Sequence, residues 1–147
     1  MLPRWHILLG AIFTLIVWAI VPMINILNLL LIFGASFLID FDHYAASVLK
    51  TKRFGLLDSF EYHKKMNLRE RREYGLGIRR KGDFHLFHTV EFHALIGFLS
   101  IPFSFFFYVF IGMIFHSLLD VISLVKAKRM YRREFFFFNW LMNKINH

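Results

Sequence analysis

Two long uncharged segments dominate the pattern of hydrophobic and polar positions along this chain. The first extends from Trp5 to Ile39 without a single Lys, Arg, Asp or Glu. About 20 apolar residues in helical form cross the hydrocarbon core of a bilayer, so this segment is longer than one span requires. Because proline interrupts helices, division at Pro22 predicts two membrane helices, over about 5–21 and 24–40, joined by a tight turn.

A second uncharged segment runs from Phe92 to Leu119 and continues at both ends into residues of mainly apolar character. Pro102 lies within it, between two serines, which favours a turn. The pattern therefore predicts two further helices, over about 84–101 and 104–125. The expected fold class is all-α, an integral membrane four-helix bundle.

The positive charges occupy three stretches that fall outside these helices. Arg4 precedes the first helix, eleven Lys and Arg lie in the loop 44–83, and six lie in the tail 126–147. Lys and Arg are retained on the cytoplasmic side of membrane proteins, and an even number of spans places all three stretches there. We therefore expect one transmembrane domain over residues 1–147, multi-pass in the inner membrane, with both termini in the cytoplasm.

Composition agrees with this picture. Hydrophobic residues make up 57% of the chain and charged residues 19%, with a mean hydropathy of +0.50, which excludes a disordered protein. The net charge of +8 would suit nucleic acid only if basic and exposed aromatic residues shared one surface. We instead interpret the loop 44–83 and the tail 126–147 as carrying helices that lie in the membrane interface, with lipid rather than nucleic acid as the partner.

Several ionisable side chains lie in or beside the apolar segments, where solvation cannot explain them. An ionised Asp at the centre of a membrane helix costs about 2.5–3.5 kcal/mol on insertion scales, so such residues are paired, metal-bound or in a wet cavity. In the predicted topology they all fall near the cytoplasmic ends of the four helices. The candidate metal ligands are His6, Asp40, Asp42, His43, His88, Glu91, His93, His116 and Asp120.

The chain has no cysteine, so any metal site must use nitrogen and oxygen donors, which suit two or three divalent cations such as zinc, manganese or iron. His116 and Asp120 are four residues apart and so share one helical face. Glu91 lies one turn after His88, whereas His93 would point elsewhere in a continuous helix. Either the ligands serve two ions, or the helix begins after His88.

At these residues the chain resembles the YdjM-like family of inner-membrane metal-dependent hydrolases, which are regulated with the LexA response. The family is in turn distantly similar to zinc-dependent phospholipase C and nuclease P1, a likeness that implies phosphoester chemistry. The motifs that carry the resemblance are His6 to Gly10, Asp40 to His43, His88 to His93 and Gly112 to Asp120. The chain departs from the family pattern outside the metal positions, at Tyr44, Thr89, Val90 and Phe92.

Cations held by His and carboxylates activate a water molecule and stabilise the attacking and leaving oxygens, and a phosphoester gains most from this. We therefore expect a hydrolase that acts on a lipid phosphoester at head-group level. Asp42 or Glu91 would be the catalytic carboxylate that orients the water. Arg79, Arg80 and Lys81, just before the third helix, would bind the substrate phosphate.

Two other classes of protein remain open. Membrane di-iron desaturases and hydroxylases also combine four spans with many cytoplasmic histidines, but they carry adjacent His-His pairs, and this sequence has none. A metal transporter, or a non-catalytic metal-binding membrane protein, should hold its ligands nearer the membrane midplane. Metal analysis would separate the three, because zinc or manganese favours hydrolysis and a pair of irons favours oxygenation.

Overall fold

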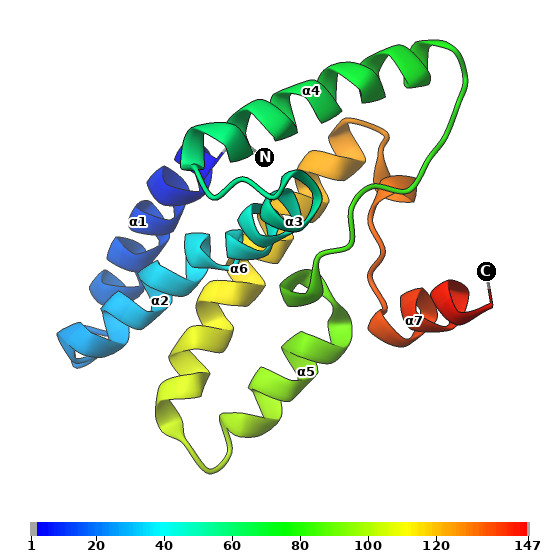
Figure 1. The fold of residues 1–147 in the computed structure, drawn as a ribbon. Helices are drawn as coiled ribbons and strands as arrows, with labels where there is room; N and C mark the ends of the chain where they lie inside the picture. Colours follow the sequence, from blue (N-terminus) through cyan, green and yellow to red (C-terminus); the bar gives the residue numbers. More distant parts are fainter. Residues whose placement is uncertain (1–2, 147) are drawn as a thin grey trace.

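The computed structural model describes residues 3–146, and within that range it contains only helices, turns and irregular segments, which confirms the all-α prediction (Figure 1). Two short 3₁₀ helices accompany the α-helices. The elements in chain order are α1 Pro3–Ile20, α2 Ile26–Leu38, α3 Phe41–Thr51, α4 Leu56–Gly75, η1 Leu86–His88, α5 Val90–Leu99, α6 Ser104–Lys126, η2 Met130–Arg132 and α7 Phe137–Ile145.

The helices form two hairpins that pack side by side, with α2 lying along α6, α1 against α2, and α5 against α6 (Figure 1). Asn25 ends the first hairpin turn, because its side-chain oxygen accepts hydrogen bonds from the backbone N–H groups of Leu27 and Asn28 and so caps α2. Beyond one end of the hairpins, α4 crosses over the bundle and packs against α3. The chain ends in α7, on the same side as α5.

Two helical segments of the described chain are long and apolar enough to span a membrane, Ile26–Thr51 and Ser104–Lys126. The four-span bundle is therefore not established. The helix expected over 84–101 is shorter than predicted, because α5 begins only at Val90, and its 10 residues rise only about 15 Å. α1 is likewise among the shorter apolar helices. The second predicted helix continues past residue 40, after a brief turn, into α3.

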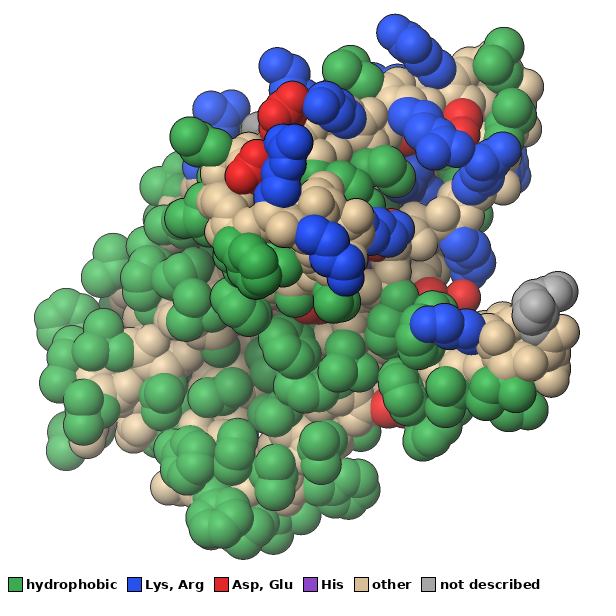
Figure 2. Space-filling model, viewed as in Figure 1, with side chains coloured by type: hydrophobic (Ala, Val, Ile, Leu, Met, Phe, Trp, Pro, Cys, Tyr) green, Lys and Arg blue, Asp and Glu red, His purple; other side chains and the backbone are tan. Residues whose placement is uncertain are grey.

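The hairpins have a largely apolar surface, whereas the buried side chains of the described residues are mainly polar. Of the described residues, only Leu29, Ile32, Ile39, Ile96 and Met113 are buried hydrophobic side chains, whereas eleven polar or charged side chains are buried. Hydrophobic side chains cover α1, α2, α5 and the adjoining part of α6, while Lys and Arg gather over α4 (Figure 2). A protein in water would bury most of the hydrophobic side chains that cover these helices. Their exposure therefore suits a lipid environment on the hairpin side.

The long basic loop is largely helical, since it contains most of α3 and all of α4. Leu56, Leu57 and Phe60 on α4 are exposed, as are Phe138 and Met142 on α7. Both helices therefore keep the amphipathic character that the sequence indicates. Their placement in a membrane interface stays a prediction.

Glycine allows α2 and α6 to approach closely. A Cβ atom at Gly112 would overlap the carbonyl oxygen of Ile32, and it would lie 2.8 Å from the Cβ of Ala35 and 3.1 Å from the backbone nitrogen of Ser36. Gly10 has the same function between α1 and α2, where a Cβ would overlap the hydroxyl of Ser36. Small residues at these crossings bring the backbones of three helices together.

The substitution Gly112→Ala should lower the free energy of unfolding by about 1–3 kcal/mol, the usual cost of overpacking, because two of the three nearest atoms are backbone atoms that cannot move aside easily. Thermal or denaturant unfolding in detergent measures the effect. Gly75→Ala is the matched control, since nothing lies within 4 Å of a Cβ there. Equal stability of the two variants would contradict the close approach of α2 and α6.

Candidate metal centre

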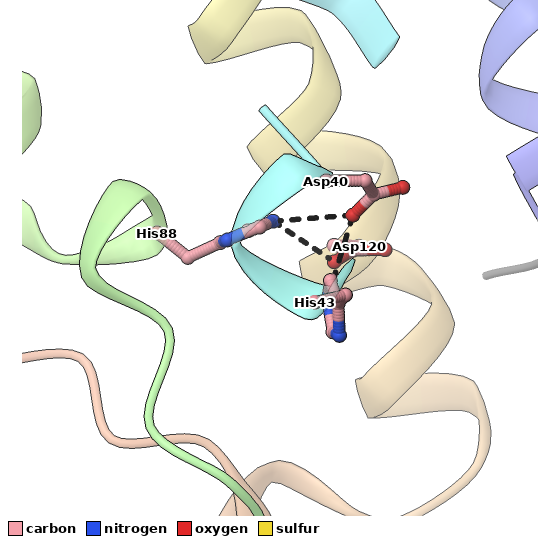
Figure 3. A group of neighbouring side chains, drawn as sticks. All are labelled: Asp40, His43, His88 and Asp120. Atoms are coloured by element: carbon pink, nitrogen blue, oxygen red, sulfur yellow. Dashed lines mark ion pairs between the residues drawn. The ribbon is translucent and has the colours of Figure 1, made fainter. Parts of the chain in front are cut away.

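Seven of the nine predicted ligands converge on one place, together with His85. They form three overlapping groups whose donor atoms lie within 4.8 Å of one another. The groups are Asp40, His43, His88 and Asp120 (Figure 3); His6, Asp40 and His116; and Asp42, His43 and His85. Asp40 and His43 each belong to two groups, so two or more cations bound here would share ligands. Clustering of buried imidazole and carboxylate groups on this scale fits a metal centre.

The junction between α2 and α3 places the first carboxylates. The backbone N–H of Asp40 bonds to the Phe37 carbonyl, and the Asp40 carbonyl accepts from the His43 N–H, which forms a short turn between the two helices. Asp40 Oδ1 consequently lies 3.4 Å from His43 Nε2, three residues on. Asp42 falls in the first turn of α3, where the helix dipole favours a carboxylate.

His88 reaches the cluster from η1, a segment outside the four long helices. Its Nδ1 lies 3.0 Å from Asp42 Oδ2, which also accepts a hydrogen bond from the backbone N–H of Phe87. Its Nε2 faces Asp40 Oδ1 at 3.6 Å and Asp120 Oδ2 at 3.8 Å (Figure 3). A carboxylate that holds one imidazole nitrogen while the other faces a cation is the usual arrangement behind a metal-bound histidine.

Burial alone would lower the pKa of His88, but its interactions with the carboxylates of Asp40 and Asp42 outweigh burial and raise that pKa. The local field at His88 Nε2 therefore favours a positive charge. A divalent cation at the same point would be favoured for the same reason.

His116 is held in the same manner, from α6. Its Nδ1 lies 2.8 Å from the carbonyl oxygen of Ser36, which can only accept, so Nδ1 carries the proton and Nε2 carries a lone pair. The Nε2 atoms of His116 and His88 are only 3.1 Å apart. Asp42 Oδ2 likewise accepts a hydrogen bond from His88 Nδ1, so the Nε2 atoms of the two rings are turned toward each other. When His88 is protonated, as its raised pKa favours, its Nε2–H can donate to His116 Nε2. A cation bound by both nitrogens would take the place of this proton, close to the carboxylates of Asp40 and Asp120.

His6 and Asp120 complete the buried side of the cluster. Nε2 of His6 lies 3.2 Å from Asp120 Oδ1, and the His6 ring stacks on that of His116 with 4.0 Å between centroids. The His6 side chain is fully buried, so it is a part of the cluster and not an interfacial histidine. The other oxygen of Asp120 contacts Arg133 at 2.6 Å. This guanidinium, from the segment after η2, is a neighbour that the sequence did not indicate.

His85, left unassigned by its sequence context, lies beside Asp42 and His43. Its Nδ1 is 3.5 Å from Asp42 Oδ1, and its ring centroid is 3.7 Å from that of His43. Burial lowers the pKa of His85, which keeps its imidazole neutral and able to bind a metal. The spacing of three residues between His85 and His88 was the available signal, because a 3₁₀ turn has three residues and aligns such positions.

Two predicted ligands lie outside the groups of donors. Glu91 accepts hydrogen bonds from the backbone N–H groups of Phe137 and Phe138, and it thereby caps the beginning of α7. His93 bonds through Nδ1 to the Thr89 carbonyl and through Nε2 to the Ser117 hydroxyl. α5 begins at Val90, so Glu91 and His93 belong to a helix that does not include His88. This agrees with the second of the two arrangements that the sequence left open, in which the helix begins after His88.

The expected catalytic carboxylates also have other partners. Asp42 is bound to His88, His85 and the backbone of Phe87, so it positions the histidines and does not face an open space. The Glu91 carboxylate is occupied by the hydrogen bonds that cap the beginning of α7. Asp40 is better placed than either of them, since it lines the adjoining cavity.

The basic residues expected to bind the substrate are engaged elsewhere. Arg80 lies 3.7 Å from Glu73, and Lys81 lies 3.1 Å from Glu134. The guanidinium of Arg79 stands over the ring of Tyr131. These three side chains point to other surfaces because the segment before η1 is extended and runs beside the C-terminal segment, where the backbone N–H of Gly82 bonds to the carbonyl of Arg132.

A cavity of about 860 Å³ adjoins the cluster, with α4 as one wall. Asp40, His43, His85 and Asp120 line it on the metal side. Its cationic residues are Lys64 and Arg71 on α4, and Arg129, Arg132 and Arg133 after α6. The cavity is large enough for a small organic molecule, and it gives that molecule direct access to the metal ligands.

No family model, curated protein or solved structure matches the chain. The resemblance of its motifs to the YdjM-like hydrolases therefore stays a prediction that rests on the residues alone. The candidate metal centre rests on the geometry of the described residues.

Substitution of His116 or Asp120 by Ala should reduce metal affinity by more than about 100-fold, the upper range for loss of a merely supporting group. Elemental analysis of the purified variants, together with titration of Zn²⁺, measures the effect. His93→Ala is the matched control on a neighbouring helix, because the His93 nitrogens are bonded to Thr89 and Ser117. Full metal content in both ligand variants would refute the centre.

Proposed function

We propose that this protein is a membrane-bound, metal-dependent hydrolase that cleaves a phosphoester of a lipid. The observation that carries the proposal is the pair of opposed Nε2 atoms of His88 and His116, with the carboxylates of Asp40 and Asp120 within 4 Å of them. Each imidazole is oriented by an acceptor at its Nδ1, as catalytic metal sites require. The adjoining cavity supplies the space for a substrate.

Bound in this position, two or more divalent cations would lower the pKa of a water molecule and stabilise the attacking and leaving oxygens of a hydrolytic reaction. The chain's own groups have distinct tasks. Asp42 and the Ser36 carbonyl hold the imidazoles of His88 and His116 in one tautomer and one orientation. Asp40, at the edge of the cavity, is the carboxylate that can accept a proton from the attacking water.

The surroundings of the site favour a phosphoester over other hydrolysable groups. Five cationic side chains line the cavity, and guanidinium groups pair with phosphate oxygens in a fixed, bidentate geometry. An uncharged ester or amide would make no use of them. The similarity of the motifs to those of phosphoester-cleaving zinc enzymes supports the same choice.

The position of the site favours a lipid. The cluster includes residues of the junction between α2 and α3 and of α6, and α4 faces it across the cavity. The surface changes from apolar side chains over the hairpins to Lys and Arg over α4 (Figure 2), so the cluster falls at the expected level of lipid head groups. With this basic surface in the cytoplasm and α1, α2, α5 and α6 in the bilayer, the protein would be multi-pass in the inner membrane. A lipid could then enter the cavity from the side.

Purified protein should release phosphate or a phosphorylated head group from lipid phosphoesters, and a chelator should abolish this activity while leaving the fold intact. A screen over lipid phosphoesters in mixed micelles, with and without chelator and with Zn²⁺ or Mn²⁺ restored afterwards, measures the reaction. His116→Ala should be inactive under all conditions and His93→Ala active. A stably bound pair of irons and oxygen-dependent product formation would instead identify an oxygenase.

A further inference from the structure

Apolar and charged side chains both line the cavity beside the metal ligands. The apolar ones include Leu56, Phe60, Met66 and Leu68 from α4 and Leu124 from α6. The side chains of Leu56, Phe60 and Leu68 are all more than half exposed, so other side chains leave them largely uncovered. An apolar chain that covers these side chains would remove them from water, which favours an amphiphile over a wholly polar substrate.

The acidic residues that line the cavity are already compensated. Glu70 is buried and bonded to two cations, Arg129 and Arg132, each at 3.0 Å. This group of three therefore carries one net positive charge. It also attaches α4 to the segment after α6 across the cavity, so the two guanidinium groups have fixed positions.

Asp83 is compensated in the same way. Its carboxylate forms an ion pair with Lys50 and accepts a hydrogen bond from the Tyr62 hydroxyl at 2.8 Å. Lys50 thus neutralises the charge of Asp83. The remaining carboxylates of the cavity, Asp40 and Asp120, belong to the metal cluster.

Three further cations line the cavity. Arg133 contacts Asp120, a metal-cluster carboxylate. Lys64 and Arg71, on the exposed side of α4, form no ion pair with any residue in the described range 3–146. Once cations occupy the cluster, positive charge predominates in the cavity. The cavity then favours a negatively charged occupant, and more strongly one with a larger negative charge.

This preference for negative charge distinguishes phosphate monoesters from phosphodiesters. A phosphate monoester carries a charge between −1.5 and −2 near pH 7, because its second pKa is about 6, and it presents three acceptor oxygens. A phosphodiester carries one charge and presents two free oxygens. Fixed guanidinium groups therefore favour the monoester both by charge and by the number of hydrogen bonds.

We infer that the substrate is a lipid phosphate monoester, with its terminal phosphate between the metal cluster and the cations Lys64, Arg71 and Arg133 and its apolar chain along α4. This rests on the proposed function and narrows it. In the reaction, the oxygen of water forms a bond to phosphorus and the bond from phosphorus to the lipid oxygen breaks. One proton of the water passes to the leaving lipid alcohol, and inorganic phosphate is the second product.

Two probes with one apolar chain test the inference, dodecyl phosphate and its methyl diester, in uncharged detergent at pH 7.5. Wild-type protein of verified metal content should bind the monoester at least about 10-fold more tightly, as expected from one additional charge-assisted contact. The variants Lys64→Ala and Arg71→Ala should each weaken monoester binding about 5-fold or more and leave diester binding nearly unchanged. Calorimetric titration measures both affinities, and phosphate release is followed in parallel.

Lys65→Ala and Arg72→Ala are the matched controls, because both residues are exposed neighbours on α4 that do not line this cavity. Equal or tighter binding of the diester, with cleavage of it, would overturn the inference while the phosphohydrolase proposal stood. Selective binding of the monoester without cleavage of either probe would refute the proposed reaction and leave the phosphate preference intact. Equal effects of control and cavity variants would also overturn the inference.

Discussion

The structure depends on the need to compensate ionisable groups buried among apolar helices. Asp42, His88, His116 and Asp120 are nearly inaccessible to solvent, and an isolated charge in such a place is costly. Each of them meets a polar or oppositely charged partner from another element of the fold. The Nε2 atoms of His88 and His116 lie 3.1 Å apart, and a proton or a bound cation between them would add to this compensation. The contacts of the cluster link α2, α3, η1 and α6 at one point.

Helix packing and the geometry of the candidate metal centre are coupled through Ser36. Gly112 allows α6 to approach the backbone of α2, and one turn further along α6, His116 Nδ1 donates to the Ser36 carbonyl. Gly10 brings α1 to the Ser36 side chain and so carries His6 towards Asp120. Separation of these helices by even a methyl group would move the imidazoles relative to the carboxylates. Small residues at the crossings are therefore a requirement of the site as well as of the fold.

The division of the molecule into an apolar and a basic part continues into the cavity. α4 contributes both apolar and cationic side chains to it, and Glu70 ties this helix to Arg129 and Arg132 on the opposite side. A substrate with a charged head and an apolar chain would match both parts at once. The basic residues just before η1 do not line the cavity, because they are paired on other surfaces.

The sequence by itself determined that the chain is helical and that nitrogen and oxygen donors gather at one level, because apolar periodicity and the cost of buried charge act locally along each segment. It also determined most of the donors, including Asp40, His116 and Asp120. Only the tertiary structure decided that α5 begins after His88, that Glu91 and His93 serve as ordinary hydrogen-bonding partners, and that Arg133 meets Asp120. These outcomes depend on turns and on contacts between distant segments, and no local pattern encodes the direction in which a side chain leaves an irregular segment.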